Sequence, residues 1–362
     1  MESYKRGSVK MDIPEFVDRE REKRELKAIL SGRPNFVYFV YGPINSGKTA
    51  LLMKVIEELP DDYVVFYINF RWRDVQTIND LIRVLFKVKR GKVSEETKEF
   101  IKEVLKGGAK VLHKLKGIPI PENMFDLLFR RADKVEDIFA YLEEYFEEIR
   151  DEGYQPVLIL DEMQTIKDVI NATGQSVLKG LFNFLIGMTK ERHLCHSLCA
   201  TSDCLFIEDV YSNARLEGRA KYLLVDDFDR ETAFRVYEEF GFEDKELVWD
   251  YIGGKIGDII SLFEEKKRGL NEKEALERML KDQVAKLRDF LEAVEEGEKG
   301  KIRENEVKEA LERLKEGEIQ SVKIPRRVRR FLIEENIIFY NPVEGTVRPQ
   351  SRLLWKAIKE LV

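Results

Sequence analysis

Hydrophobic and polar positions form two alternating patterns over the first 226 residues. Short runs rich in β-branched and aromatic residues predict strands, and longer stretches with apolar residues three and four apart predict helices between them. This alternation is typical of βαβ units, so we predict an α/β core with a parallel sheet for residues 1–226. The predicted strands are 36–41, 63–70, 156–160, 196–201 and 222–225, and the predicted helices are 48–59, 77–86 and 177–191.

The pattern changes after residue 226. Residues 229–297 have helical spacing almost throughout, which predicts a helical lid domain at 227–300. Residues 301–362 are predicted to be a winged-helix domain, and a Lys- and Glu-rich section at about 87–131 is predicted to be a helical insertion in the core. The winged-helix segments are helices at 305–316 and 325–336, a hairpin of 337–340 with 346–348, and a last helix from Ser351.

Composition narrows the class of protein. The chain has 362 residues, 43% apolar and 36% charged, so it has apolar surface enough for a large core and length enough for two or three domains. No apolar run approaches the roughly 18–20 residues of a membrane span, and the N-terminal residues lack a signal-peptide pattern. Three cysteines are too few for a disulfide framework. We therefore expect a cytoplasmic protein that does not enter a membrane.

The charge is unevenly distributed. The chain carries a net charge of −6, yet residues 319–362 hold nine Lys and Arg against four acids, a local net charge of +5. The rest of the chain is correspondingly acidic. This distribution argues against a protein that coats nucleic acid with its whole surface, and it places a basic C-terminal module on an acidic body.

A phosphate-binding pattern follows the first predicted strand. Residues 42–49 match G-x-x-x-x-G-K-S/T, the Walker A motif, and lead directly into a predicted helix. Lys48 would reach the β- and γ-phosphates of ATP, and the Thr49 hydroxyl would hold Mg²⁺. Backbone amides and the helix N-terminus would surround the phosphates. The predicted nucleotide-binding residues are Gly42, Pro43, Ile44, Asn45, Ser46, Gly47, Lys48, Thr49 and Ala50.

Two acids end the apolar run 157–160. We assign Asp161 to Mg²⁺ and Glu162 to the orientation of the attacking water, because hydrolysis needs both a metal ligand and a carboxylate that polarises water. An acidic pair after a strand is more often a solvated turn. Together with the phosphate-binding pattern it predicts a catalytic pair, Glu162 and Lys48 being the catalytic residues.

Five segments in order resemble the archaeal ATPase family, which is similar to the AAA+ and STAND nucleoside triphosphatases. They are 16–20, 42–49, 160–164, 200–202 and 218–219, and the resemblance covers about residues 13–263 plus a winged-helix tail. It implies a P-loop ATPase core of AAA+-like architecture with a helical lid.

The resemblance also implies roles for residues outside the two Walker motifs. Phe16 and Arg19 would lie against the adenine, and Thr201 or Ser202 would sense the γ-phosphate. Arg219 would act as a catalytic arginine finger, from a neighbouring copy or in cis. The alternatives for these residues are a helix entry, a strand end and a surface arginine.

Histidines and cysteines cluster between residues 193 and 204, which suggests a metal site. In a strand, however, Cys195 and Cys199 would lie about 13 Å apart at about 3.3 Å per residue, too far to share one ion. We therefore expect buried thiols and histidines with hydrogen-bond partners.

The basic run near the start of the helix at 325–336 has two interpretations. Its arginines would contact DNA phosphates if this were a recognition helix, or they would dock against the acidic body of the same chain. A protein partner is a further option, because winged helices also contact proteins. The arginines are Arg326, Arg327, Arg329 and Arg330.

We conclude from the sequence that the chain is a Mg²⁺-dependent P-loop ATPase in which nucleotide drives a conformational switch. The alternative is a DNA-binding winged-helix protein whose geometry is set by bound ATP with slow turnover. A nucleoside kinase is a third option, disfavoured because the acidic pair suits activation of water.

Overall fold

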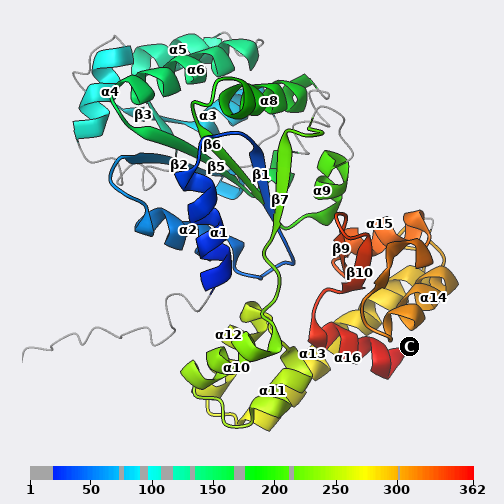
Figure 1. Ribbon diagram of the computed structural model, residues 1–362. Helices are drawn as coiled ribbons and strands as arrows, with labels where there is room; N and C mark the ends of the chain where they lie inside the picture. Colours follow the sequence, from blue (N-terminus) through cyan, green and yellow to red (C-terminus); the bar gives the residue numbers. More distant parts are fainter. Residues whose placement is uncertain are drawn as a thin grey trace, which may run out of the picture. The chain divides into compact units, whose positions relative to one another are not determined.

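The computed structural model of the protein describes residues 19–72, 77–89, 97–106, 117–130, 135–166, 176–211, 216–300 and 302–362 (Figure 1). The described residues form two compact units. The sheet unit holds Glu20–Asp226 and Glu316–Gln350, and the helical unit holds Arg19, Asp227–Lys315 and Ser351–Val362. The three predicted domains and their boundaries stay a prediction.

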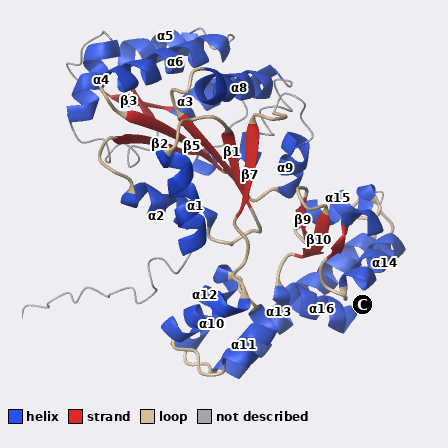
Figure 2. Ribbon diagram, in the orientation of Figure 1, coloured by secondary structure: helices blue, strands red, loops and turns tan. Residues whose placement is uncertain are grey.

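Five parallel strands form the main sheet, in the order β2-β5-β6-β1-β7 (Figure 2). This confirms the α/β fold with a parallel sheet. Because the strands are parallel, their carboxyl ends meet at one edge, and β6 lies between β1 and β5. The strands are β1 (Val37–Tyr41), β2 (Tyr63–Asn69), β5 (Gln155–Asp161), β6 (His196–Thr201) and β7 (Ala220–Leu224).

Helices cover both faces of this sheet. In Figure 2, α1 (Glu20–Ser31) and α2 (Lys48–Glu58) lie on one face, and α6 (Val135–Asp151) and α8 (Ser176–Ile186) lie on the other. Aromatic contacts join the second layer to the sheet: the ring of Phe66 lies 5.7 Å from that of Phe146 on α6. Helix α8 continues into a π-helical turn, Gly187–Glu191. The sheet is thus buried on both faces, as its continuous apolar runs predict.

The insertion at 87–131 is not wholly helical, so that prediction is wrong in part. It holds α4 (Thr97–Lys106) and α5 (Glu122–Arg130), which follow α3 (Ile78–Leu85), but also a parallel pair of strands, β3 (Phe86–Lys89) and β4 (Ile118–Pro121). The sequence of β4 is Ile-Pro-Ile-Pro. In a two-stranded sheet every strand is an edge strand, where the missing N–H of proline is tolerated. Both isoleucines of β4 are fully buried.

A small antiparallel sheet completes the sheet unit, with strand order β8-β10-β9. The predicted hairpin is confirmed as β9 (Ile338–Asn341) and β10 (Thr346–Pro349). It follows β8 (Ile319–Gln320), a short 3-10 turn (Ser321–Lys323) and α15 (Arg326–Glu334). The Tyr41 hydroxyl, at the end of β1, donates to Asn341 Oδ1 at 2.8 Å. This buried bond ties the hairpin to the strand that precedes the phosphate-binding loop.

Among its described residues, the regular secondary structure of the helical unit is entirely helical, as the spacing predicts for residues 229–297. A close backbone approach fixes one of its turns: a Cβ on Gly254 would lie 1.8 Å from the carbonyl oxygen of Phe228. No described helix combines the length and the apolar character that a membrane crossing requires. The helices are α10 (Arg230–Glu239), α11 (Lys245–Ile252), α12 (Ile256–Lys267), α13 (Glu272–Glu295), α14 (Glu304–Leu314) and α16 (Arg352–Leu361).

Candidate active site

The loop between β1 and α2 folds too tightly for ordinary residues at its glycines. A Cβ on Gly42 would lie 2.1 Å from the carbonyl oxygen of Val225, so only glycine fits there. Gly47 has a φ of +89° and caps the N-terminus of α2. Asn45 also has a positive φ, +60°, which asparagine tolerates better than most residues. The sequence of the loop is therefore dictated by its backbone path.

The ammonium group of Lys48 lies inside this loop. Its Nζ donates to the carbonyl oxygens of Pro43 at 2.7 Å and Gly42 at 3.1 Å, and lies 3.4 Å from the Ser46 hydroxyl. Lys48 is buried, with 8% of its surface exposed. A buried cation at the positive end of α2 makes the concave side of the loop strongly attractive to anions.

Asp161, at the end of β5, is held by three donors. Its Oδ2 accepts from the Thr49 hydroxyl at 2.8 Å and from the Tyr67 hydroxyl at 2.6 Å, and its Oδ1 accepts from the Glu162 N–H at 2.9 Å. Burial, together with the Asp161 charge, raises the pKa of Tyr67, so this phenol stays a proton donor. The Thr49 hydroxyl and the Asp161 carboxylate are the hard oxygen ligands that Mg²⁺ prefers, and they lie side by side.

Glu162 has a left-handed backbone, with φ of +59°, so its side chain leaves the strand direction. Its Oε2 accepts from Gln164 Nε2 at 2.5 Å and lies 3.0 Å from Nε of Arg71. Burial and the neighbouring Asp161 charge raise the pKa of Glu162, while the Arg71 cation lowers it. The carboxylate is thus held in a defined position beside the metal-type ligands.

The end of β6 brings Thr201 and Ser202 to the same edge of the sheet. The Thr201 hydroxyl donates to Gln164 Oε1 at 2.6 Å and accepts from the Asp203 N–H at 3.1 Å. Ser202 Oγ lies 3.5 Å from Gln164 Nε2. Because β6 separates β1 from β5, these residues lie between the loop and the acidic pair.

A cavity of about 1030 Å³ opens in the sheet unit beside the loop. Ile44 of the loop, Gln164 and Ser202 line it together with residues of α9 (Cys204–Tyr211) and α15. Arg71 and Arg330 also line it. Ile44 is thus the residue of the loop that borders this cavity.

Arg219 is not brought to this edge. It directly precedes β7, and its carbonyl oxygen accepts from the N–H of Val37 at the start of β1. The loop follows the other end of β1, five residues away, or about 16 Å at about 3.3 Å per residue. To act on nucleotide in the same chain, the Arg219 side chain would have to reach along the whole length of β1. An arginine finger supplied by a neighbouring copy stays a prediction.

Of the two residues predicted to contact adenine, the structure describes Arg19. Phe16 falls outside the described residues. Arg19 belongs to the helical unit, where its guanidinium carbon lies 4.2 Å from the centroid of the Phe228 ring. Their contact with adenine stays a prediction.

Three residues that the sequence analysis did not assign hold the site together: Tyr67, Arg71 and Gln164. Tyr67 and Arg71 belong to the end of β2 and the turn after it, where Asn69 pairs in register with Asp161. The polar residues at the end of the predicted strand 63–70 could have indicated that this strand contributes to the site. Gln164 lies two residues after Glu162, within the quoted motif, and only its contacts reveal its position.

The cysteines Cys195, Cys199 and Cys204 are buried free thiols, and burial raises the pKa of each. Burial also lowers the pKa of His196 to about 4. Within the described part of the chain, no group of three or more His, Cys, Asp or Glu side chains is placed to hold a metal ion.

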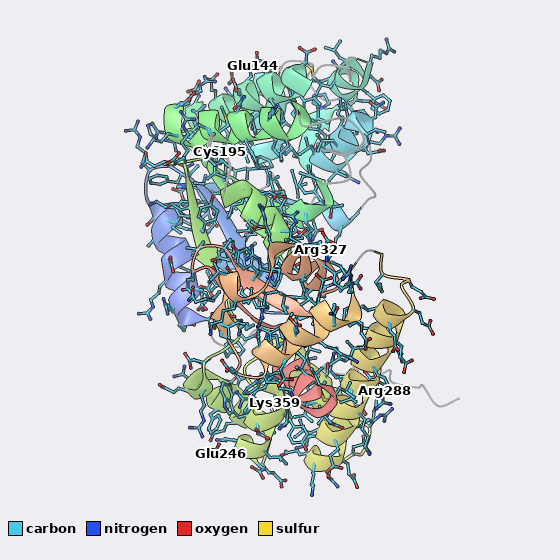
Figure 3. The ribbon with its side chains drawn as sticks, turned by 90° about the vertical axis from the view of Figure 1, so that its right-hand side faces the viewer. Glu144, Cys195, Glu246, Arg288, Arg327 and Lys359 are labelled. Atoms are coloured by element: carbon cyan, nitrogen blue, oxygen red, sulfur yellow. The ribbon has the colours of Figure 1, made fainter. Side chains whose placement is uncertain are left out.

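Three of the four arginines at the start of α15 converge on one buried acid of α9, Glu208. Guanidinium nitrogens of Arg326, Arg329 and Arg330 lie 3.5, 3.4 and 3.2 Å from its carboxylate oxygens. Arg329 is buried with 8% of its surface exposed. Arg327, labelled in Figure 3, is exposed. The interpretation in which this helix docks against the body of the same chain is therefore observed, whereas DNA contact stays a prediction.

A glycine-constrained loop with a buried lysine, beside an acidic pair at the carboxyl edge of a parallel sheet, defines a P-loop nucleotide-binding fold. The chain belongs to the family of ATPase domains found predominantly in Archaea, whose model matches residues 16–262. Residues 273–362 match the model of the C-terminal domain of uncharacterized MJ1010-like ATP-binding proteins. The resemblance to the archaeal ATPase family is confirmed.

Similar proteins extend over almost the whole chain. The ATP-binding protein MJ0147 of Methanocaldococcus jannaschii is 44% identical over 96% of this chain and 98% of its own length. MJ0801 of the same organism is 45% identical over 96% of this chain and 100% of its own length. Among solved structures, the Walker-type ATPase PABY2304 of Pyrococcus abyssi has a TM-score of 0.62 at 19% identity, covering 95% of this chain and 96% of that one. The Aeropyrum pernix ORC2 protein has a TM-score of 0.51 at 12% identity, covering 96% of this chain and 97% of that one. Both solved structures therefore share the fold of this chain.

Proposed function

We propose that the protein binds ATP with Mg²⁺ and hydrolyses it to ADP and phosphate. One observation carries this proposal: Lys48, the Thr49–Asp161 pair and Glu162 meet at one edge of the sheet. The family of ATPase domains and the ATP-binding relatives support the choice of nucleotide.

Each group at this edge then has a chemical task. The Lys48 ammonium exchanges its carbonyl partners for β- and γ-phosphate oxygens, and the backbone N–H groups of residues 45–50 bind the remaining phosphate oxygens. Thr49 and Asp161 hold Mg²⁺, which neutralises phosphate charge when bound. Glu162 accepts a hydrogen bond from the attacking water and so orients it.

We further propose that nucleotide binding and hydrolysis act as a conformational switch of the AAA+ and STAND type. Strand β6 runs into α9 through residues 202–203, and α9 carries Glu208, on which α15 docks. A change at the phosphate end of the site therefore has a short path to the docked helix, along the chain as far as Glu208 and from there through its ion pairs with α15.

The test is phosphate release by the full chain with ATP, with and without Mg²⁺. We expect turnover that is lost when the metal is removed with EDTA and restored by added Mg²⁺. Asp161→Asn should raise the Mg²⁺ concentration needed for half-maximal turnover at least tenfold, because it removes the charge of one ligand. Asp282→Asn, at an exposed position on α13, is the matched control. A full chain that neither binds ATP nor releases phosphate contradicts the proposal.

Nucleic-acid binding is a second candidate, favoured by the exposed side chain of Arg326, which is 70% accessible, and by exposed Arg327. Arg326, Arg329 and Arg330 all pair with Glu208, and the side chains of Arg329 and Arg330 are 9% and 35% exposed. Arg326 and Arg327 are therefore the more accessible pair for phosphates. DNA contact by all four arginines requires α15 to leave α9.

Two double variants separate docking from DNA contact. Changing Arg329 and Arg330 to Ala should lower the melting temperature by several degrees, because breaking a buried ion pair costs about 3 kcal/mol. Changing Arg326 and Arg327 to Ala should leave it nearly unchanged. If the chain binds DNA through the exposed pair, that second variant flattens the salt dependence of binding by about two units. Equal melting temperatures for the two variants contradict the docking role.

A further inference from the structure

The side chain of Gln164 bridges two elements of the site. It belongs to the 3-10 turn Met163–Thr165 that follows Glu162, and it reaches from the end of β5 to the end of β6. Its Nε2 donates to Glu162 Oε2 at 2.5 Å, and its Oε1 accepts from Thr201 Oγ1 at 2.6 Å. It also lines the cavity beside the loop, together with Ser202.

Hydrogen-bond chemistry fixes the orientation of this amide. The Asp203 N–H donates to the Thr201 hydroxyl, so the single hydroxyl proton is available for Gln164. An ionised Glu162 carboxylate can only accept. The amide oxygen therefore faces Thr201 and the NH₂ group faces Glu162, because the flipped amide would set its oxygen against the carboxylate.

The NH₂ group has two protons, and only one serves Glu162. The second is directed toward Ser202, but at 3.5 Å this contact is at the limit of a hydrogen bond. Thr201, by contrast, is 1% exposed and is not part of the cavity lining. Gln164 and Ser202 therefore line the cavity beside the loop, whereas Thr201 is buried.

We propose that Gln164 is a positioning residue for ATP hydrolysis: Thr201 fixes its amide so that its NH₂ group holds the Glu162 carboxylate in position for the attacking water. This inference rests on the proposed ATPase function. It gives Thr201 an indirect role, because its hydroxyl orients Gln164 and does not touch the γ-phosphate.

The test compares Gln164→Met and Thr201→Val, which keep size but remove the hydrogen bonds, with the double variant. Each single change should lower kcat about 10- to 100-fold, because Glu162 is no longer held in place. KM, and the Kd for ATP measured in a Mg²⁺-free buffer, should stay within about threefold. The double variant should be no slower than the slower single variant, because the two residues act as one unit. Gln155→Met, at the other end of β5, is the matched control with unchanged kcat.

Two results would overturn this inference while leaving the ATPase function intact. The first is a double variant whose loss equals the product of the two single losses. The second is a Thr201→Val variant that loses preference for ATP over ADP, which would mark Thr201 as a direct phosphate contact. A parent chain without ATP binding or turnover overturns the proposed function itself, so the two failures are distinguishable.

Discussion

Replacing Lys48 with Ala is expected to abolish ATP turnover and weaken ATP binding. The ammonium group is buried inside the loop, where it donates to carbonyl oxygens 2.7 and 3.1 Å away. In the nucleotide complex that we propose, the same donor serves the β- and γ-phosphates, where negative charge builds up during transfer. Removing one such preorganised donor costs about 10²–10³ in kcat. Steady-state phosphate release and equilibrium binding of ATP and ADP measure the two effects separately.

Lys54→Ala is the matched control for this change. Lys54 lies on the same helix, α2, with its side chain 37% exposed and paired with acidic residues of that helix. It should retain the parent rate. Melting temperatures of both variants show whether the loop stays folded. Turnover at the parent rate in Lys48→Ala would remove the assignment of residues 42–49 to phosphate binding.

Replacing Glu162 with Gln is expected to leave ATP bound but unhydrolysed. The amide keeps the size of the side chain and one acceptor oxygen for Gln164 and Arg71, but it loses the charge that polarises water. General-base groups contribute about 10²–10⁴ in rate, so kcat should fall by that factor with the Kd for ATP changed less than about threefold. Single-turnover phosphate release, with ATP retention on a filter or desalting column, measures both quantities.

Two comparisons make this prediction specific. Glu57→Gln, at an exposed position on α2, should be indistinguishable from the parent. Asp161→Asn should alter the Mg²⁺ dependence, because Asp161 is bonded to the Thr49 hydroxyl and Glu162 is not. An unchanged kcat in Glu162→Gln together with an inactive Asp161→Asn would show that the two roles are assigned the wrong way round.

Much of the site was predictable because its two main parts are local in sequence. A glycine pattern specifies the backbone path of residues 42–49, and an apolar run that ends in two acids specifies a strand and its last residues. Both parts follow parallel strands, so the sequence alone predicts that they meet at the carboxyl edge of a sheet. The strand order then brought Thr201 and Ser202 to the same edge.

The remaining contacts depend on partners far apart along the chain. Tyr67 donates to Asp161, 94 residues away, and Arg329 is bonded to Glu208, 121 residues away. No local pattern marks a tyrosine in a strand or one arginine in a basic run as different from its neighbours. Arg219 likewise lies at the amino end of β1 because of the register between β1 and β7. The sequence near Arg219 does not reveal that register.

The alternation of strands and helices, the phosphate-binding loop, the acidic pair and the family could all be predicted from the sequence, because each depends on residues close together in the chain. The three-dimensional structure was needed to show which groups hold Asp161 and Glu162, that Gln164 and Ser202 line the cavity while Thr201 is buried, and that three arginines of α15 pair with Glu208. These depend on where the ends of separate strands and helices meet. That meeting is set by packing of the whole core, and a local segment carries no information about its distant partner.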